Sequence, residues 1–182
     1  MIDPVGELKT RAEILHRRIT SGNPDAVARL RALPELARAD AEALALAAPR
    51  MQRKHCLFVV AREHGFGTWE HARRVLGGDA READFGSLMY GKQGAGHLNV
   101  WFVRHDEARD YLDGVRRDGG RRYLLPYRRQ FFVADGFFVE GLGLDPGDAD
   151  WEAIDFDWVR PRDPVARQRL TQKRLDALRG EP

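Results

Sequence analysis

The sequence predicts an α+β protein, with helical hairpins at the N-terminus followed by a small α/β domain. Two observations predict this class. Apolar residues recur at helical spacing over roughly the first 80 positions, whereas short runs beyond that point alternate between apolar and polar residues as strands do. The glycine-containing segment 77–84 separates the two patterns. The predicted domains are therefore residues 1–78 and 84–182, and the second should contain a sheet of three or four strands and a C-terminal helix.

The composition is that of a chain able to bury a core. Hydrophobic residues make up 43% of the sequence and the formal net charge is +2, which excludes disorder as the default. No apolar run approaches the roughly 20 residues that a membrane span requires. A single cysteine, Cys56, permits no intramolecular disulfide, and the N-terminus lacks the pattern of a signal peptide. We therefore expect a cytoplasmic protein that does not contact a membrane.

Helices account for the whole of the first domain. An apolar stripe predicts the first helix, because Leu8, Leu15 and Ile19 share one face. Asn23 and Pro24 are typical of the start of a second helix, and Gly65 is typical of a helix end. We expect helices at residues 8–20, from residue 24, and at 41–48, 52–64 and 69–76.

One segment of this domain resembles a known module. Ala61-Arg62-Glu63-His64-Gly65-Phe66-Gly67-Thr68-Trp69 is similar to a segment of many bacterial ankyrin-like proteins, where it also occurs in N-terminal helical modules ahead of unrelated domains. The resemblance covers roughly residues 5–77. It implies an ankyrin-like helical scaffold in a bacterial protein and implies no catalysis.

The second domain mixes strand and helix patterns. We expect strands at residues 85–90, 97–103 and 123–134, and helices at 105–117, 137–144 and 164–178. Pro126 argues for a break, a bulge or an edge within the third strand. Asp135-Gly136 is compatible with a hairpin or with the start of a helix, and we favour the helix. Asp148 or Asp150 is expected to cap a further short helix.

This domain also resembles an uncharacterised family of small bacterial proteins. The resemblance rests on Tyr123-Leu124-Leu125-Pro126-Tyr127, Gln130-Phe131-Phe132, Leu142-Gly143-Leu144-Asp145-Pro146, Asp150-Trp151 and Asp157-Trp158-Val159. It covers about residues 84–165 and implies no activity.

Several motifs that would carry chemistry are not satisfied. The loop Gly91–Gly96 lacks the Gly-Lys-Ser/Thr ending of a phosphate-binding P-loop, and a strand rather than a helix should follow it. The histidines show no His-Glu-x-x-His pattern, and the acidic run from Asp145 lacks the glycine and glutamate of a calcium loop. We therefore expect no cofactor and no metal.

Candidate catalytic residues lie beside that loop. Alternation places His97, Asn99 and Trp101 on one strand face, and polar groups beside an aromatic ring are typical of a ligand pocket. A sheet face half covered by the N-terminal helices is the alternative. His97 and His105 are the candidate acid–base residues, and Asn99 and Trp101 are candidate ligand-binding residues.

Arginines and tyrosines define a second candidate region. Tyr123, Tyr127, Arg128 and Arg129 are candidate ligand-binding residues, because arginine beside an aromatic ring can hold an anion or stack on a base. Unbroken alternation would also place Phe131 on their face. Residues 104–129 carry eight arginines and five acids, whereas 135–163 carry nine acids and two arginines. The two stretches either pair with each other or face solvent, or the basic one meets an anionic ligand. The chain's other arginines need no special role.

These patterns lead to two hypotheses. The first is a non-enzymatic binding or interaction protein, whose α/β domain recognises a small molecule or a protein partner, as a resistance or immunity protein would. The alternative is a small enzyme that uses His97 or His105 in acid–base chemistry on an anionic or aromatic substrate. A nucleic-acid partner is disfavoured, because the net charge of +2 is too small.

Overall fold

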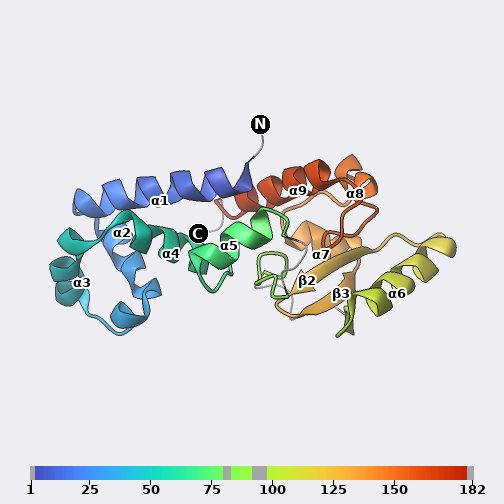
Figure 1. Cartoon of the computed structure of the whole chain (residues 1–182), viewed down its shortest axis with the longest axis horizontal. Helices are drawn as coiled ribbons and strands as arrows, with labels where there is room; N and C mark the ends of the chain where they lie inside the picture. Colours follow the sequence, from blue (N-terminus) through green and yellow to red (C-terminus); the bar gives the residue numbers. More distant parts are fainter. Residues whose placement is uncertain (1–2, 80–82, 92–97, 180–182) are drawn as a thin grey trace. The chain divides into compact units, whose positions relative to one another are not determined.

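A computed structural model describes residues 3–79, 83–91 and 98–179, and it confirms the predicted α+β class (Figure 1). The described chain divides into two compact units. The helical unit comprises Val5–Arg73, and the α/β unit contains the rest. The division lies inside helix α5 (Trp69–Leu76), a few residues before the predicted boundary at 78–84.

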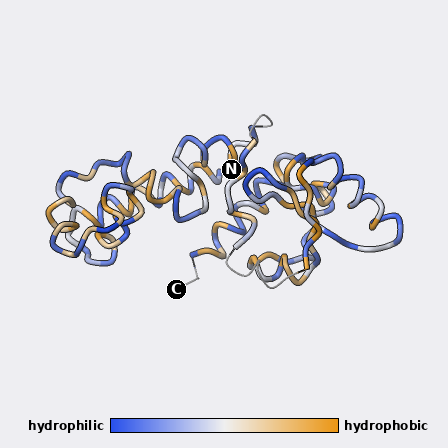
Figure 2. Tube along the Cα trace, turned by 90° about the horizontal axis from the view of Figure 1, so that it is seen from below, coloured by the Kyte–Doolittle hydropathy of each residue, from blue (hydrophilic) through white to orange (hydrophobic). Residues whose placement is uncertain are grey.

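Short helices joined by tight turns build the helical unit. They are α1 (Pro4–Thr20), α2 (Pro24–Ala28), α3 (Ala41–Ala47) and α4 (Arg53–Glu63), with 3₁₀ turns at Arg29–Ala32, Pro34–Leu36 and Ala48–Arg50. Asn23 caps α2 as predicted, because its side chain accepts a hydrogen bond from the backbone N–H of Ala26 at 3.0 Å. Hydrophobic and hydrophilic residues alternate along the helices (Figure 2), which is the pattern that the sequence periodicity predicts.

The predicted apolar stripe of α1 forms the centre of this unit's core. Leu8, Leu15 and Ile19 are all buried. Hydrogen bonds fix the packing around them: a ring nitrogen of His16 lies 3.0 Å from the carbonyl oxygen of Met51. Gly65 adopts a φ of +84°, which allows the chain to leave α4 as expected for a helix-ending glycine.

The α/β unit contains a three-stranded antiparallel sheet with the order β1-β3-β2. Its elements are β1 (Val100–Phe102), α6 (His105–Arg117), β2 (Tyr123–Tyr127), β3 (Gln130–Ala134), α7 (Gly136–Gly141), α8 (Ala149–Ala153) and α9 (Pro164–Ala177). Asp135 caps α7 and Asp148 caps α8, so both predicted caps are confirmed. Residues 85–90 form turns rather than the predicted strand.

The expected third strand is in fact a hairpin. Residues 123–134 form β2 and β3, and Arg128 and Arg129 make the two-residue connection between Tyr127 and Gln130. Arg128 has a positive φ of 53°, which permits so tight a turn. The turn restarts the alternation of faces. Phe131 therefore lies on the opposite face of the sheet from Tyr127, contrary to the prediction from unbroken alternation.

Two arginines of α9 hold the α/β unit together, although no sequence pattern distinguishes them from the other arginines. Arg167 donates hydrogen bonds to the carbonyl oxygens of Trp158 and Val75, and its guanidinium lies 3.8 Å from the centre of the Trp158 ring. Arg174 donates to the carbonyl oxygens of Leu88 and Leu142. Burial lowers the pKa of Arg167 to about 10, so the guanidinium remains charged at neutral pH. Together the two arginines donate charge-assisted hydrogen bonds to four carbonyl oxygens.

Candidate functional site

Aromatic side chains gather on one face of the sheet, beside its β1 edge. The ring of Tyr90 lies 4.4 Å from that of Tyr127 and 5.5 Å from that of Trp101, measured between ring centres. Trp101 and Tyr127 are themselves 6.0 Å apart. Tyr90 and Tyr127 are half-buried, whereas Trp101 is 39% exposed. We call these three residues, together with Asn99, the aromatic surface.

Strand register determines how this surface is assembled. Trp101 pairs with Phe132 across β1 and β3, and the two rings are 4.8 Å apart. Phe138 of α7 packs against Phe132, with the two ring centres 5.1 Å apart. Both phenylalanines are buried. They form a rigid apolar base, which holds the outer aromatic rings in fixed positions.

Asn99 shares a strand face with Trp101, because side chains two residues apart point to the same side of a sheet. Its Nδ2 atom is buried and has no hydrogen-bond partner within residues 3–79, 83–91 and 98–179. A buried amide donor without a partner costs free energy, and such a donor is a common feature of sites that bind a ligand. The structure thus brings together Asn99, Trp101 and Tyr127, three of the predicted ligand-binding residues.

The hairpin arginines occupy the neighbouring turn. The guanidinium of Arg128 lies 5.4 Å from the centre of the Tyr127 ring, so this predicted pairing of arginine and tyrosine is present. Arg129 is exposed at the same turn. The turn is further fixed by backbone hydrogen bonds, because the N–H of Arg128 donates to Gly86 and its carbonyl accepts from Phe85.

Tyr123 has a different environment from the other predicted residues. It is buried at the far end of β2, its hydroxyl donates to the carbonyl oxygen of Pro146 at 2.6 Å, and its ring packs on Trp151. Burial raises the pKa of this hydroxyl. These contacts give Tyr123 a role in holding the chain beyond β3, apart from the aromatic surface.

The two candidate catalytic histidines fall in different situations. His97 and most of the neighbouring glycine loop lie outside the described residues. His105 begins α6 and is only 6% exposed, and its Nε2 atom lies 2.8 Å from a carboxylate oxygen of Asp157. Its ring packs edge-on against Phe131 on the opposite face of the sheet from Trp101. The His105–Asp157 pair is therefore separated from the aromatic surface by the sheet itself.

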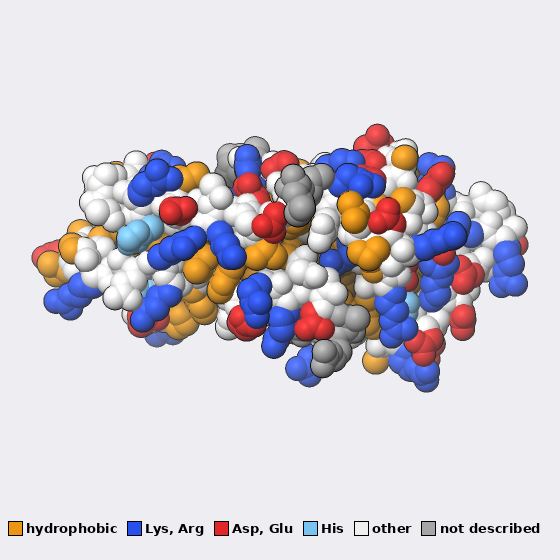
Figure 3. All heavy atoms as spheres, turned by 45° about the horizontal axis from the view of Figure 1, so that its top comes forward, with side chains coloured by type: hydrophobic (Ala, Val, Ile, Leu, Met, Phe, Trp, Pro, Cys, Tyr) orange, Lys and Arg blue, Asp and Glu red, His pale blue; other side chains and the backbone are white. Residues whose placement is uncertain are grey.

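The basic and acidic stretches pair with each other, which was one of the expectations from the sequence. Arg109 and Arg116 of α6 both bind Asp155, and Arg121 lies 3.4 Å from Glu152. Burial opposes ionisation of Asp155, but the hydrogen bonds from Arg116 and Arg109 outweigh it and lower the pKa of the carboxyl group. Basic and acidic side chains are interspersed on the face in Figure 3. Because Arg109, Arg116 and Arg121 pair with acidic side chains, fewer arginines of this stretch remain to bind an anionic ligand.

Two features are absent from the residues that the structure describes. No cluster of three or more histidine, cysteine, aspartate or glutamate side chains within them could hold a metal ion. No helix in the same part of the chain is long and apolar enough to cross a membrane.

Comparisons with known proteins add nothing to this geometry, because the chain matches no family model, no curated protein and no solved structure. The two resemblances noted from the sequence therefore stay predictions. The class that fold and site define is an α+β protein with an exposed aromatic surface at the edge of its sheet.

Sequence reasoning missed Tyr90, the residue at the centre of the aromatic surface. The predicted strand at residues 85–90 would make Tyr90 part of the sheet. In the structure, Tyr90 instead lies over one face of the sheet. The available signal was its position directly before Gly91, which has a φ of +52°. An aromatic residue beside a glycine turn often covers an adjacent sheet face, but only the tertiary structure shows which face.

Proposed function

We propose that this chain is a non-enzymatic binding protein, whose α/β unit binds an extended segment of a protein partner along β1 and across the aromatic surface. One observation carries the proposal. The side chains along the β1 edge are apolar and exposed, at 38% for Val100, 39% for Trp101 and 73% for Val103. Proteins normally protect such an edge with charges or proline, and an unprotected edge is suited to the addition of a partner strand.

The opposite edge of the sheet supports this choice of strand. There, the N–H of Leu124 donates to the carbonyl oxygen of Phe156, and Leu124 accepts from the N–H of Trp158. The outer edge of β2 is therefore occupied by the chain itself. Within the described residues, β1 pairs only with β3, so its other edge is available.

The chemistry of the surface favours a peptide with apolar side chains at alternate positions. Backbone hydrogen bonds to β1 would provide affinity without sequence preference, and a side chain of the peptide that points to the same face as Trp101 would pack on the Trp101 ring. The Nδ2 donor of Asn99 is buried, so the side chain would have to move before this donor could bind a carbonyl oxygen of the peptide.

A peptide-display selection against the full chain tests this function. We expect it to select peptides with alternating apolar residues. Trp101→Ala should weaken their binding about tenfold or more, because truncating a central aromatic residue removes much of an interface's affinity. Phe137→Ala is the matched control, since Phe137 is 74% exposed but lies on α7 outside the aromatic surface. Val103→Lys should also weaken binding, because a lysine obstructs strand addition.

Two results would contradict the proposal. One is a selection that yields no such peptides, and the other is peptides that bind wild type and Trp101→Ala equally well. Circular dichroism of each variant verifies that the fold is retained, so that a loss of binding reports on the surface.

A small enzyme is the second candidate, and the His105–Asp157 hydrogen bond is the observation that favours it. A carboxylate that orients a histidine ring is a common arrangement of a general base. Against it, both side chains are buried, and the Nδ1 atom of His105 has no partner within the described residues. If a substrate screen finds turnover, loss of turnover in His105→Ala with peptide binding intact would establish this function instead.

A further inference from the structure

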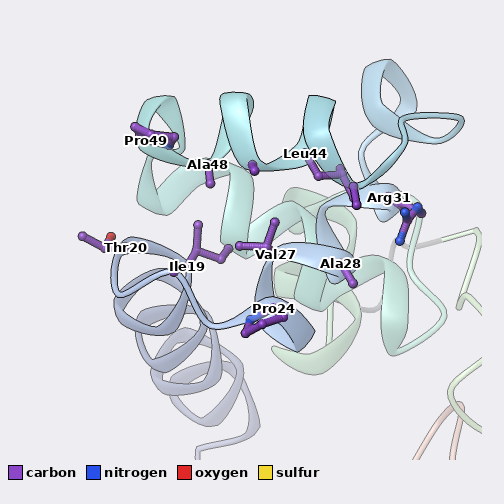
Figure 4. Close-up of a pocket in the computed structure, with 12 residues that line it drawn as sticks. Ile19, Thr20, Pro24, Val27, Ala28, Arg31, Leu44, Ala48 and Pro49 are labelled. Atoms are coloured by element: carbon purple, nitrogen blue, oxygen red, sulfur yellow. The ribbon is translucent and has the colours of Figure 1, made fainter.

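A cavity of about 530 Å³ is lined wholly by residues of the helical unit. It is bounded by the end of α1, by α2 and by α3 (Figure 4). Its volume is typical of small-molecule sites, which span about 300–1,000 Å³. Nothing in the proposed function uses this cavity.

The wall of the cavity is apolar. Ile19 and Leu44 are buried at its base, and Val27 is half-buried beside them. Two of the α3 residues that line it, Ala41 and Ala45, have small side chains, so the helices do not close the space between them. Such a wall is suited to an alkyl or similarly apolar group.

The two ends of the cavity differ in polarity. Arg31 lies at one end and Thr20 at the other (Figure 4). The Thr20 hydroxyl is already used, since it donates to the carbonyl oxygen of His16 at 2.9 Å. Arg31 donates through Nε to the carbonyl oxygen of Ala39, and no carboxylate within the described residues pairs with its guanidinium. Its two terminal nitrogens thus remain available at the rim.

We propose that this cavity binds an amphipathic anion, with an unbranched apolar chain between α2 and α3 and a carboxylate held by Arg31. Charge complementarity decides the class of ligand, because Arg31 is the only charged side chain among the described residues that line the cavity. Arginine holds a carboxylate through two parallel hydrogen bonds, and those bonds are charge-assisted. The apolar wall supplies the remaining affinity.

Calorimetric titration of the full chain with decanoate, below its micelle concentration, tests the proposal. Arg31→Gln should weaken decanoate binding about tenfold, because a charge-assisted hydrogen bond is lost. Binding of the uncharged methyl ester of decanoate should not change in this variant. Arg38→Gln is the control for net charge, since Arg38 is an exposed arginine that does not line the cavity.

A second pair of variants tests the apolar wall. Ala45→Phe should abolish binding of both decanoate and its methyl ester, because the ring fills the space between the helices. Ala43→Phe should leave both unchanged, since Ala43 is exposed on α3 and does not line the cavity. Absence of decanoate binding, or decanoate binding that neither Arg31→Gln nor Ala45→Phe weakens, overturns the proposal. Neither outcome of the decanoate experiment changes the expected peptide binding at the aromatic surface. Each proposal can therefore be refuted without refuting the other.

Discussion

The Nε2 atom of His105 lies 2.8 Å from the Oδ2 atom of Asp157, a residue 52 positions later in the chain. The other carboxylate oxygen of Asp157 accepts the backbone N–H groups of Val159 and Arg160, each at 2.9 Å. Both partners are buried. This one carboxylate therefore joins the start of α6 to the turn that follows α8.

Replacement of Asp157 should be costly for stability. Asp157→Ala removes three hydrogen bonds, of which the one to His105 is fully buried, so we expect the free energy of unfolding to fall by about 3 kcal/mol. Asp106→Ala is the control, because Asp106 is exposed and solvent screens its pairs with Arg104 and Arg160, so we expect little change in stability. Urea unfolding followed by tryptophan fluorescence measures both, since Trp151 and Trp158 are buried in this unit. Equal effects of the two variants would refute the assignment.

The stability of the helical unit should depend on pH through His64. This side chain is buried, its Nδ1 atom lies 2.7 Å from the carbonyl oxygen of Val60, and its Nε2 atom lies 2.8 Å from Arg11. Burial, and secondarily the positive charge of Arg11, lowers the pKa of His64 below its ordinary value of 6.5. As the pH falls below 6.5, the unfolded chain takes up a proton that the folded unit does not. The free energy of unfolding of this unit therefore decreases, until the pH reaches the folded-state pKa.

Hydrogen exchange of the α4 amides measures this effect within the helical unit alone. We expect protection to decrease between about pH 7 and pH 5, after correction for the intrinsic exchange rate. His64→Gln should be less stable than wild type at neutral pH and should show a smaller decrease. Identical pH profiles in the two proteins would show that His64 is not the group responsible.

Arginine should not be replaceable by lysine at position 167. The guanidinium binds two carbonyl oxygens and stacks on Trp158 at once, whereas an ammonium group has neither the planar shape nor the reach for all three. Arg167→Lys should lower the free energy of unfolding by about 2 kcal/mol, as judged by urea unfolding. Arg162→Lys, at an exposed position shortly before α9, should change it by less than about 0.5 kcal/mol. Similar results for both would mean that the buried contacts of Arg167 contribute little.

Two glycines that end helices should respond differently to alanine. Both have a positive φ, +71° at Gly143 and +79° at Gly119. A Cβ atom at Gly143 would also lie 2.6 Å from the Cβ of Ala177 in α9, whereas one at Gly119 would meet open space. Gly119→Ala should cost about 1 kcal/mol from the backbone alone, and Gly143→Ala about 3 kcal/mol. Thermal unfolding distinguishes the two, and equal shifts in Tm would exclude the close approach of α9 to Gly143.

Local patterns predicted most of the helices well. α6 spans the predicted residues 105–117, and Asp135 starts α7 as expected, because side-chain caps and apolar spacing act within a few residues. The sheet was predicted less well. Arg128 and Arg129 do not carry the glycine or asparagine that typically signals a two-residue turn, so the hairpin between β2 and β3 was missed.

The candidate site could be predicted only in part, for a related reason. Asn99, Trp101, Tyr127 and Arg128 were named from local alternation and composition, and the structure brings them together. Tyr90 was missed and Tyr123 lies elsewhere, because the side of the sheet that a loop covers depends on contacts distant in sequence. The buried roles of Arg167 and Arg174 have the same origin.

The sequence by itself determined the fold class and the positions of most helices, because both follow from spacing along a short piece of chain. It left open whether the basic stretch pairs with the acidic one. Tertiary structure alone decided that His105 is buried against Asp157 while Trp101 stays exposed at a sheet edge. It also decided that α1, α2 and α3 leave an apolar cavity with Arg31 at its rim. Burial depends on what the rest of the chain places over a residue, and no local pattern specifies that.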